Sequence, residues 1–508
     1  MDFPDAEKPT NAAQWRRAAR VAALLAFLAY LEIVGLYSGA VAAGSDSSGY
    51  FNHAKVLTTG SVHAKVRVLS GLPQGALSPY LYVPLGFRPA WDGNGMVATY
   101  PLGLSLFIVA LKALIGWRHA GDAVILMHTA AGIVATYALA RLLGLSRPWS
   151  VLCSAAIALS PLYMFMSQQA MSDVPSLAWT TFAVVAALRG RESSRWALAA
   201  GFALSIDVLL RPANLLAAVP VLLALGWAPR RWALLVLAGI PGAIVFFANN
   251  AASYGSFLAT GYGDNSGAFS GTNVSGTLLH YAHWIPILFT PLAFLALGLP
   301  FLPPAKYRPA VLLSSWIIVF AAFYCVYQNT HEAWWYLRFL LPAAPALVVG
   351  AALVLRMLLS RTESGRGISS SPVAFVVALA LVASSSIWWA TTLGAMRAGD
   401  EELNYGILTD WMRANLPPDA VCLAMQTSGS VYFYTTFTIL RWDMIGKEDV
   451  PRVMAAVSGA KRPLYAVLFP YEVPQIGELQ RTMRGKWLPV GRINEVLVFQ
   501  RLDAPSGT

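Results

Sequence analysis

The stretch YPLGLSLFIVALKALIGW, residues 100–117, decides the membrane topology of the rest of this chain. A helix needs about 20 apolar residues to cross the hydrocarbon core of a bilayer, and this stretch is nearly that long. Lys112 interrupts it, however, and a tyrosine and a tryptophan stand at its two ends, which is typical of segments in the membrane interface. We predict a helix that lies in the outer interface and does not cross.

The composition of the whole chain is that of a polytopic membrane protein. Hydrophobic residues make up 57% of the 508 residues, charged residues make up 12%, and the mean hydropathy is +0.55. Ordinary soluble domains are far less apolar. The net charge of +11 comes from short basic clusters between apolar runs, which are typical of cytoplasmic loops, so we exclude nucleic-acid binding. The three cysteines lie far apart in the sequence and indicate neither a disulfide framework nor a zinc site.

Eleven apolar stretches predict membrane-spanning helices. The first is preceded by arginines and followed by AVA at 40–42, which resembles a signal-peptidase site. We expect it to remain uncleaved, because the leader would be unusually long and Glu32 lies inside its apolar part. The predicted spans are residues 18–37, 121–143, 148–167, 174–189, 196–210, 212–229, 232–252, 284–303, 309–328, 338–358 and 371–392.

The basic clusters determine the topology of these spans. If the chain starts in the cytoplasm and residues 100–117 do not cross, every cluster between later spans falls on the cytoplasmic side, as the positive-inside rule requires. If residues 100–117 did cross, those clusters would all lie outside. The prediction therefore makes residues 38–120 one long external loop. It also places on the outer side the loops 168–173, 253–283 and 329–337, the turn at 210–211, and the tail from about residue 394.

The tail differs in composition from the rest of the chain. Its pattern predicts a small α/β unit, with a helix around 400–414 and strands near 421–426, 463–469 and 495–501. No glycine-rich phosphate loop opens a helix there, so nucleotide binding is not predicted. The predicted organisation is a cytoplasmic N-terminus at 1–17, a transmembrane domain at 18–393 and an external α/β domain at 394–508.

Two acidic residues on the outer side are candidates for catalysis. Asp46, in GSDSSGY, follows the first span, and Asp173, in MSDVP, starts a later one. Each also has an ordinary explanation. An aspartate after a helix is commonly a solvated turn residue, and an aspartate before a proline is a common helix start. From these positions alone both explanations remain open.

Two arginines on the outer side are candidates for binding an anionic lipid. Arg211, in LRPAN, and Arg338, in WWYLRFLLP, lie where the positive-inside rule gives no reason for an arginine. One explanation is interfacial anchoring with a snorkelling side chain. The other is a clamp on a lipid phosphate, because the guanidinium fork fits phosphate oxygens. His331 stands in the same segment, and the tryptophans beside Arg338 would contact the first carbons of the lipid chain.

Several motifs, taken in order, resemble the GT-C superfamily of integral-membrane glycosyltransferases, which includes the protein O-mannosyltransferases and the lipid A aminoarabinose transferase. They are GSDSSGY after the first span, YPLGLSLF at the end of the first loop, MSDVP, LRPAN, NNAASYGSFLATGY and WWYLRFLLPAAP. The resemblance covers residues 15–395 approximately. It implies transfer of a sugar from a polyprenyl phosphate donor to a lipid, glycan or protein acceptor. The reaction would take place on the outer side of the membrane, with the periplasm or exterior facing the active site of a bacterial inner or plasma membrane enzyme.

The resemblance also implies roles for the candidate residues. Asp46 matches the first-loop catalytic acid and would accept the proton of the acceptor hydroxyl, and Asp173 matches the second-loop acid. Arg211, Arg338 and His331 would bind the donor phosphate and oppose the charge that grows on it. No covalent nucleophile is evident, so a single displacement with inversion is the simplest mechanism.

The sequence departs from the family pattern beside the first acid. Many relatives carry two adjacent acids in the first loop, whereas Ser47 follows Asp46 here. Two alternatives therefore stay open: a divalent cation, Mg²⁺ or Mn²⁺, held by Asp46 and Asp173, or a site without a metal. Tyr50 and His53 would share the face of Asp46 if a helix starts there. With Trp335 they would line the substrate pocket, or they are packing residues.

Two other functions use the same residues. A transporter or flippase of a lipid-linked sugar would grip the phosphate with the same arginines and catalyse nothing, and a membrane scaffold would only display the tail. The long external loop with its acid favours the transferase, since a flippase needs access from both sides. The absence of P-loop, HExxH and GxSxG motifs excludes ATP-driven transport, zinc proteolysis and nucleophile-elbow hydrolysis from the leading interpretations.

Overall fold

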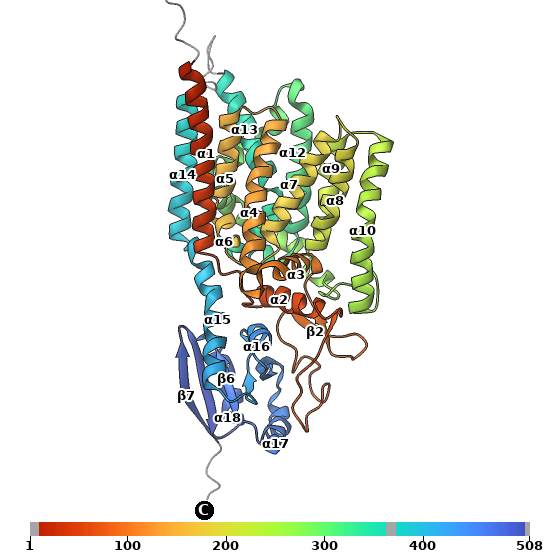
Figure 1. The fold of residues 1–508 in the computed structure, drawn as a ribbon, viewed down its shortest axis with the longest axis vertical. Coiled ribbons are helices and arrows are strands. Elements are labelled where there is room, and N and C mark those ends of the chain that lie inside the picture. The colour runs from red at the N-terminus through yellow and green to blue at the C-terminus, as the bar shows by residue number, and fades with distance from the viewer. Residues whose placement is uncertain (1–9, 362–371, 503–508) are drawn as a thin grey trace, which may run out of the picture.

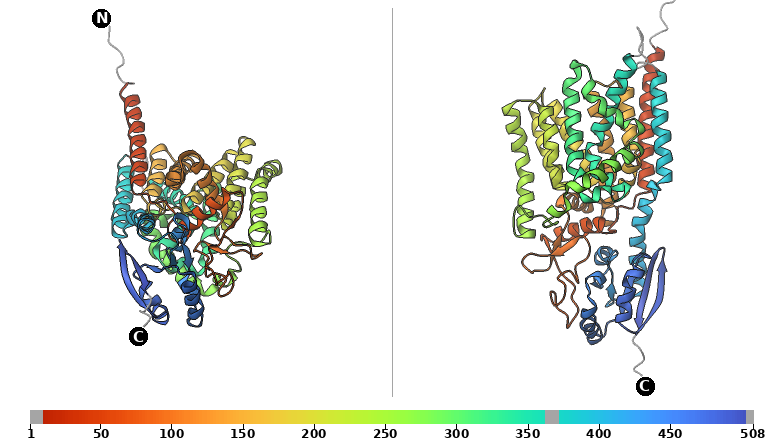
Figure 2. Two further views of the ribbon diagram at one scale, coloured as in Figure 1. Left: turned by 60° about the horizontal axis from the view of Figure 1, so that its bottom comes forward. Right: turned by 180° about the vertical axis from the view of Figure 1, so that it is seen from behind.

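The computed structural model describes residues 10–361 and 372–502. In these residues the chain is mostly helical, with a bundle of long helices and a small C-terminal sheet beyond one end of the bundle (Figure 1). We call the end of the bundle next to this sheet the site end. The helix α1 (Thr10–Leu36) starts at the opposite end and runs beside α14 (Pro372–Thr392), as the views in Figures 1 and 2 agree.

Every predicted span falls on helical residues, although several of the helices are short or broken. Six helices in the described ranges are long and apolar enough to cross a membrane, and the number is seven if a pair bent by 112°, Gly271–Leu288 and Pro291–Phe301, counts as one span. The count of eleven is therefore not confirmed. The other helices of the bundle are α5 (Arg147–Ala158), α6 (Pro161–Met166), α7 (Asp173–Arg189), α8 (Arg195–Leu210), the 3-10 helix η1 (Pro212–Ala217) and α9 (Ala218–Leu225).

The long helices expose apolar surface that only a membrane would cover. They are α1, α4 (Trp117–Leu142), α10 (Pro229–Tyr254), α12 (Tyr307–Cys325), the 3-10 helix η7 (Trp334–Ala343) continued by α13 (Ala344–Arg361), and α14. Only 6% of the apolar stretch of α1 and 11% of that of α10 are buried by other parts of the protein. Exposed apolar faces of this size are unfavourable in water, so the chain is an integral membrane protein.

The helix predicted at residues 100–117 is present as α3 (Leu102–Ile115). Its 14 residues extend for about 21 Å, which is less than the thickness of the hydrocarbon core. Figure 1 shows it beside α2 (Asp46–Leu57) at the site end, across the direction of the long helices. The Nζ atom of Lys112 lies 5.3 Å from the ring centre of Trp117, where the ammonium group is attracted to the ring face.

The C-terminal sheet has the strand order β5-β4-β6-β8-β7. The strands β4 (Val421–Leu423), β5 (Thr438–Leu440) and β6 (Leu464–Leu468) are parallel, while β8 (Val496–Leu502) is antiparallel to both of its neighbours, β6 and β7 (Lys486–Ile493). The helices are α15 (Ala398–Asn415), α16 (Ser428–Tyr434), α17 (Val450–Ala460) and α18 (Val473–Thr482).

The predicted helix of the tail and its three predicted strands are observed as α15, β4, β6 and β8. The prediction missed β5 and β7. The strand β5 has three residues, too few to show a pattern, and β7 is largely exposed and contains Pro489 and Gly491 at a register shift, which are unusual inside strands.

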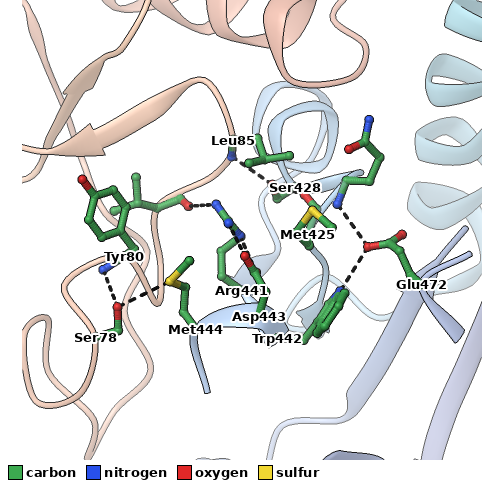
Figure 3. A network of polar contacts seen from close by, with 12 residues as sticks. Ser78, Tyr80, Leu85, Met425, Ser428, Arg441, Trp442, Asp443, Met444 and Glu472 are labelled. Atoms are coloured by element: carbon green, nitrogen blue, oxygen red, sulfur yellow. Dashed lines mark hydrogen bonds and ion pairs between the residues drawn. The ribbon is translucent and has the colours of Figure 1, made fainter. Parts of the chain in front are cut away.

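The C-terminal sheet shares a hydrophobic core with the long first loop. Leu69, Leu72 and Leu81 of the loop pack in the same buried cluster as residues of β4, β5 and α17. The backbone N–H of Arg441 donates to the carbonyl of Leu81 (2.7 Å), and Figure 3 shows the neighbouring contacts, among them the bond from the N–H of Leu85 to Ser428 Oγ (3.0 Å). The predicted division at residue 394 stays a prediction, and the structure adds that loop residues complete the core of the tail.

Two glycines bring α15 against the end of α1. A Cβ atom on Gly399 would lie 1.9 Å from the carbonyl oxygen of Tyr37, and one on Gly39 would lie 2.1 Å from the carbonyl oxygen of Gly399. Real Cβ atoms do not come this close, so the two backbones can touch only because both residues are glycine. This contact determines where the first turns of α15 lie.

We expect Gly399→Ala to destabilise the protein by roughly 1–3 kcal/mol, because both clashing atoms belong to backbone that cannot move away cheaply. The matched control is Gly406→Ala on the same helix, where nothing lies within 4 Å of the new Cβ. That variant should be neutral or more stable by up to about 1 kcal/mol, since alanine favours helix. The measurement is the melting temperature of the two purified variants in detergent. Equal melting temperatures would show that the contact does not position α15.

Candidate functional site

A cavity of about 260 Å³ lies at the site end, between the helix bundle and the C-terminal domain. We call it the site cavity. Residues from four distant parts of the chain line it: the beginning of α2, the segment around α6, the beginning of η7, and the C-terminal domain. Among them are Asp46, Met171, Trp335, Arg338, Glu402 and Gln426.

Asp46 is the first residue of α2, where the helix dipole favours a negative charge. Its Oδ1 atom accepts a hydrogen bond from the hydroxyl of Tyr100 (2.5 Å), and its Oδ2 atom accepts one from Nη2 of Arg338 (3.1 Å). Burial and the charge of Asp46 raise the pKa of Tyr100 well above its usual value, so the phenol remains a donor. The carboxylate is held from two sides and keeps free lone pairs, and its side chain is 26% exposed to the cavity.

Arg338 comes from η7 and lies mostly buried next to the cavity, with 14% of its side chain exposed. Besides Asp46, its guanidinium contacts the sulfur of Met171 (3.0 Å). The guanidinium carbon lies 5.5 Å and 5.6 Å from the ring centres of Tyr336 and Phe339. The aromatic faces and the carboxylate together stabilise this mostly buried cation.

A second ion pair lies behind the first. Asp173, the first residue of α7, is 2% exposed, and its Oδ1 atom is 2.9 Å from Nη1 of Arg211, which follows the last residue of α8. Arg338 also interacts electrostatically with Asp173, so the two pairs form one group of charges. The hydroxyl of Tyr50 donates to Ser172 Oγ (3.1 Å) and ties α2 to the start of α7. Neither Asp173 nor Arg211 lines the site cavity.

The C-terminal domain adds a third carboxyl group, Glu402 of α15, that the sequence analysis did not identify. The hydroxyl of Ser47 donates to its Oε2 atom (2.7 Å). Burial, helped by the charge of Asp46, raises the pKa of Glu402 to about 8, so this carboxyl group is neutral at pH 7. Near it, Gln426 Nε2 donates to the hydroxyl of Tyr405 (3.1 Å). The domain therefore supplies a polar wall to the cavity.

The other predicted site residues lie in different places. Trp335 lines the site cavity and stacks on Phe165. Tyr50 and His53 are buried in α2 beside the cavity, not in its lining, and burial lowers the pKa of His53 to about 4. His331 faces Thr277, with 3.4 Å between Nδ1 and Oγ1, and does not line the cavity either.

The residues at the site do not fit a divalent metal ion. Across the described ranges no group of three or more His, Cys, Asp and Glu side chains could hold one. The two aspartates that the sequence offered as ligands of Mg²⁺ or Mn²⁺ each face a guanidinium group instead, at 3.1 Å for Asp46 and 2.9 Å for Asp173. A metal ion in the same positions would be repelled by both cations, so we derive no step through a metal.

The fold is similar to that of solved glycosyltransferases, whereas no protein-family model and no curated protein sequence matches the chain. ArnT from Cupriavidus metallidurans bound to undecaprenyl phosphate superposes with a TM-score of 0.59 and 14% identity, over 98% of this chain and 100% of that one. The apo oligosaccharyltransferase of Archaeoglobus fulgidus superposes with a TM-score of 0.53 and 12% identity, over 88% of this chain and 70% of that one. The arabinofuranosyltransferase AftD from Mycobacteria superposes with a TM-score of 0.51 and 13% identity, over 96% of this chain and 40% of that one.

Proposed function

We propose, on the premise that this chain has the GT-C glycosyltransferase fold, that it transfers a sugar from a polyprenyl phosphate to an acceptor hydroxyl. The observation that carries the proposal is the site cavity, in which a carboxylate and a guanidinium group meet between the membrane bundle and an outer domain. Undecaprenyl phosphate in the ArnT structure and an acceptor peptide in another structure of the archaeal enzyme support the two classes of substrate.

In the proposed reaction the acceptor oxygen attacks the anomeric carbon of the sugar, and the bond from that carbon to the phosphate oxygen breaks. The electron pair of this bond leaves with polyprenyl phosphate, and the hydroxyl proton passes to a free lone pair of Asp46. A single displacement of this kind inverts the anomeric centre.

Arg338 connects the base to the leaving group. In the free protein its guanidinium pairs with the Asp46 carboxylate at 3.1 Å. As the reaction proceeds, Asp46 loses its negative charge by taking the proton while the phosphate gains one. The positive charge of Arg338 is then available to the phosphate at the moment when it is needed, which is how fixed charges lower the barrier of a displacement.

The buried pair of Asp173 and Arg211 would position this charge without touching the substrate. Asp173 attracts Arg338 and holds Arg211, so it keeps both guanidinium groups on one side of the cavity. On the same side Phe165, Met166 and Trp335 offer apolar surface for the first carbons of a prenyl chain. The polar wall of the C-terminal domain would face the acceptor.

We place the site on the outer side of the membrane, in a bacterial inner or plasma membrane, and keep eleven spans as part of this proposal. Basic residues in the loops and helix ends at the end opposite the site, among them Arg191, Arg231 and Arg308, support this orientation through the positive-inside rule. The test of the proposal is to incubate the purified protein with labelled polyprenyl-phosphate sugars and a membrane extract. Label that moves into an acceptor supports a transferase. Label that only crosses the membrane of a vesicle, still attached to the lipid, would support a flippase.

The proposed function predicts a particular pH dependence of donor binding. The two carboxylates and two guanidinium groups cancel in charge, so ionisation of Glu402 would give the site a net negative charge and weaken its affinity for the donor phosphate. Because the pKa of Glu402 is about 8, raising the pH through 8 adds a negative charge next to Asp46. We expect the KM for the donor to rise by roughly fivefold or more between pH 7 and pH 9, since nearby like charges are worth about 1 kcal/mol or more in such a site.

The matched variant is Glu402→Gln, which keeps the shape and cannot ionise. Its KM for the donor should stay flat from pH 7 to pH 9, and at pH 7 it should equal that of the native protein. Steady-state rates at a series of donor concentrations, recorded at pH 7 and at pH 9, measure the KM of the variant and of the native protein. A parallel rise of KM in the two proteins would show that another group causes the dependence.

A further inference from the structure

A second cavity, of about 410 Å³, lies at the end of the bundle opposite the site end. The loop after α7, the end of α9 and the beginning of α12 bound it. Three arginines line it, Arg191, Arg231 and Arg308, together with the aromatic residues Trp227 and Tyr307. We call it the arginine cavity.

Hydrogen bonds fix part of this cavity in place. Arg191 donates from Nε to the carbonyl of Ala224 (2.6 Å) and from Nη2 to the carbonyl of Leu223 (3.0 Å), so it caps the last turn of α9. Arg231 donates from Nη2 to the carbonyl of Arg191 (2.8 Å). Two of the three arginines are therefore linked to each other and to the backbone, unlike solvated side chains on a loop.

The three positive charges lack a negative partner in the part of the chain that the structure describes. None of the ion pairs found there involves these arginines. Burial, together with the charges of Arg308 and Arg231, lowers the pKa of Arg191, which shows that the like charges repel one another. An anion with several oxygens would relieve this repulsion and use the remaining guanidinium donors.

The surroundings of the cavity indicate that the anion belongs to a lipid. Trp227 is 84% exposed and Tyr307 is 68% exposed, and such amphipathic rings favour the headgroup region of a membrane. The apolar outer face of α10, which starts next to the cavity at Pro229, would lie along acyl chains. The positive-inside rule explains basic loops in general, yet it does not require three guanidinium groups around one cavity.

We propose that the arginine cavity binds the phosphate group of an anionic phospholipid, in the membrane leaflet opposite the glycosyl transfer site. The phosphate would lie between Arg191, Arg231 and Arg308, with the rings of Trp227 and Tyr307 at its edge. The site is separate from the proposed reaction, so it can be present whether or not the chain transfers a sugar.

The test compares two double variants of the full chain that lose the same charge at the same end of the bundle. Arg231→Gln with Arg308→Gln removes two arginines of the cavity and leaves Arg191, which caps α9. Arg195→Gln with Arg230→Gln is the control, because both of these arginines are exposed and neither lines the cavity. Melting temperatures in plain detergent confirm that both variants fold. Native mass spectrometry then measures the retention of phosphatidylglycerol and of phosphatidylcholine during titration.

The native protein should retain one phosphatidylglycerol about 10-fold more tightly than phosphatidylcholine. The cavity variant should lose about 25-fold in affinity for phosphatidylglycerol, because each guanidinium that donates directly to the phosphate contributes at least roughly fivefold. The control should change less than twofold, because its two arginines do not line the cavity. Equal losses in the two variants would overturn the proposal, since general positive charge would then explain the binding. Displacement of the lipid by millimolar inorganic phosphate would also overturn it, because the site would then bind free phosphate.

Discussion

Replacing Asp46 with asparagine should lower the turnover number for sugar transfer by about 10²- to 10⁴-fold, the usual contribution of a positioned general base. The asparagine side chain has the same shape, but its one carbonyl oxygen can accept from only one of the two atoms to which Tyr100 and Arg338 now donate, and it cannot take up the acceptor proton. The KM for the donor should change little, since Arg338 remains in place. Initial rates of label transfer over a range of donor concentrations measure the two parameters.

The matched control for this variant is Asp410→Asn. Asp410 is an exposed acid of α15, the helix that carries Glu402. It pairs with Arg413, and neither residue lines the cavity. The Asp410→Asn variant carries the same chemical change as Asp46→Asn, and its rate of sugar transfer should equal that of the native protein. If Asp46→Asn also transfers sugar at the native rate, Asp46 is not the base.

Replacing Arg338 with glutamine should lower kcat/KM for the donor by roughly 10²- to 10³-fold, because it removes the cation that opposes the charge growing on the phosphate. Arg338→Lys should recover part of this loss, since an ammonium group keeps the charge without the guanidinium fork. The variant also leaves Asp46 without its ion-pair partner, so its melting temperature must be compared with that of the native protein. The measurement is the rate of label transfer at low donor concentration.

Arg413→Gln provides the control for Arg338, because Arg413 is an exposed arginine of the C-terminal domain whose charge lies away from the cavity. It should leave kcat/KM unchanged. A native rate in Arg338→Gln would contradict the phosphate-binding role. A loss in Arg338→Gln without any recovery in Arg338→Lys, when the lysine variant melts at the native temperature, would show that positive charge alone does not account for the role of Arg338.

The sequence predicted a mostly helical membrane protein from charge and hydropathy, because these properties act residue by residue. Arg211 and Arg338 stood out since the positive-inside rule does not explain them, and the structure brings both into one group of charges with Asp46 and Asp173. The number of spans was harder to predict. Prolines and short turns interrupt several apolar stretches, as at Pro161 between α5 and α6, and hydropathy does not show such breaks.

The parts of the site that the sequence did not predict depend on contacts between distant segments. Glu402 lies next to Ser47 although 355 residues separate them, and in the sequence it is one of several acids at the start of an amphipathic helix. The sequence pattern indicates an interfacial anchor at Tyr100, whereas in the structure its hydroxyl donates to Asp46. The short sequence distance between His331 and Arg338 predicts a shared site, but His331 faces Thr277 in the structure. Periodicity and spacing carry no information about such pairings.

A structure of the full chain with polyprenyl phosphate, determined by electron cryomicroscopy in a lipid nanodisc, tests the central claim most directly. The account predicts the phosphate in the site cavity, about 3 Å from the Nη atoms of Arg338, with the first prenyl carbons against Trp335 and Phe165. A phosphate bound elsewhere at the site end, out of reach of both Arg338 and Asp46, would contradict it.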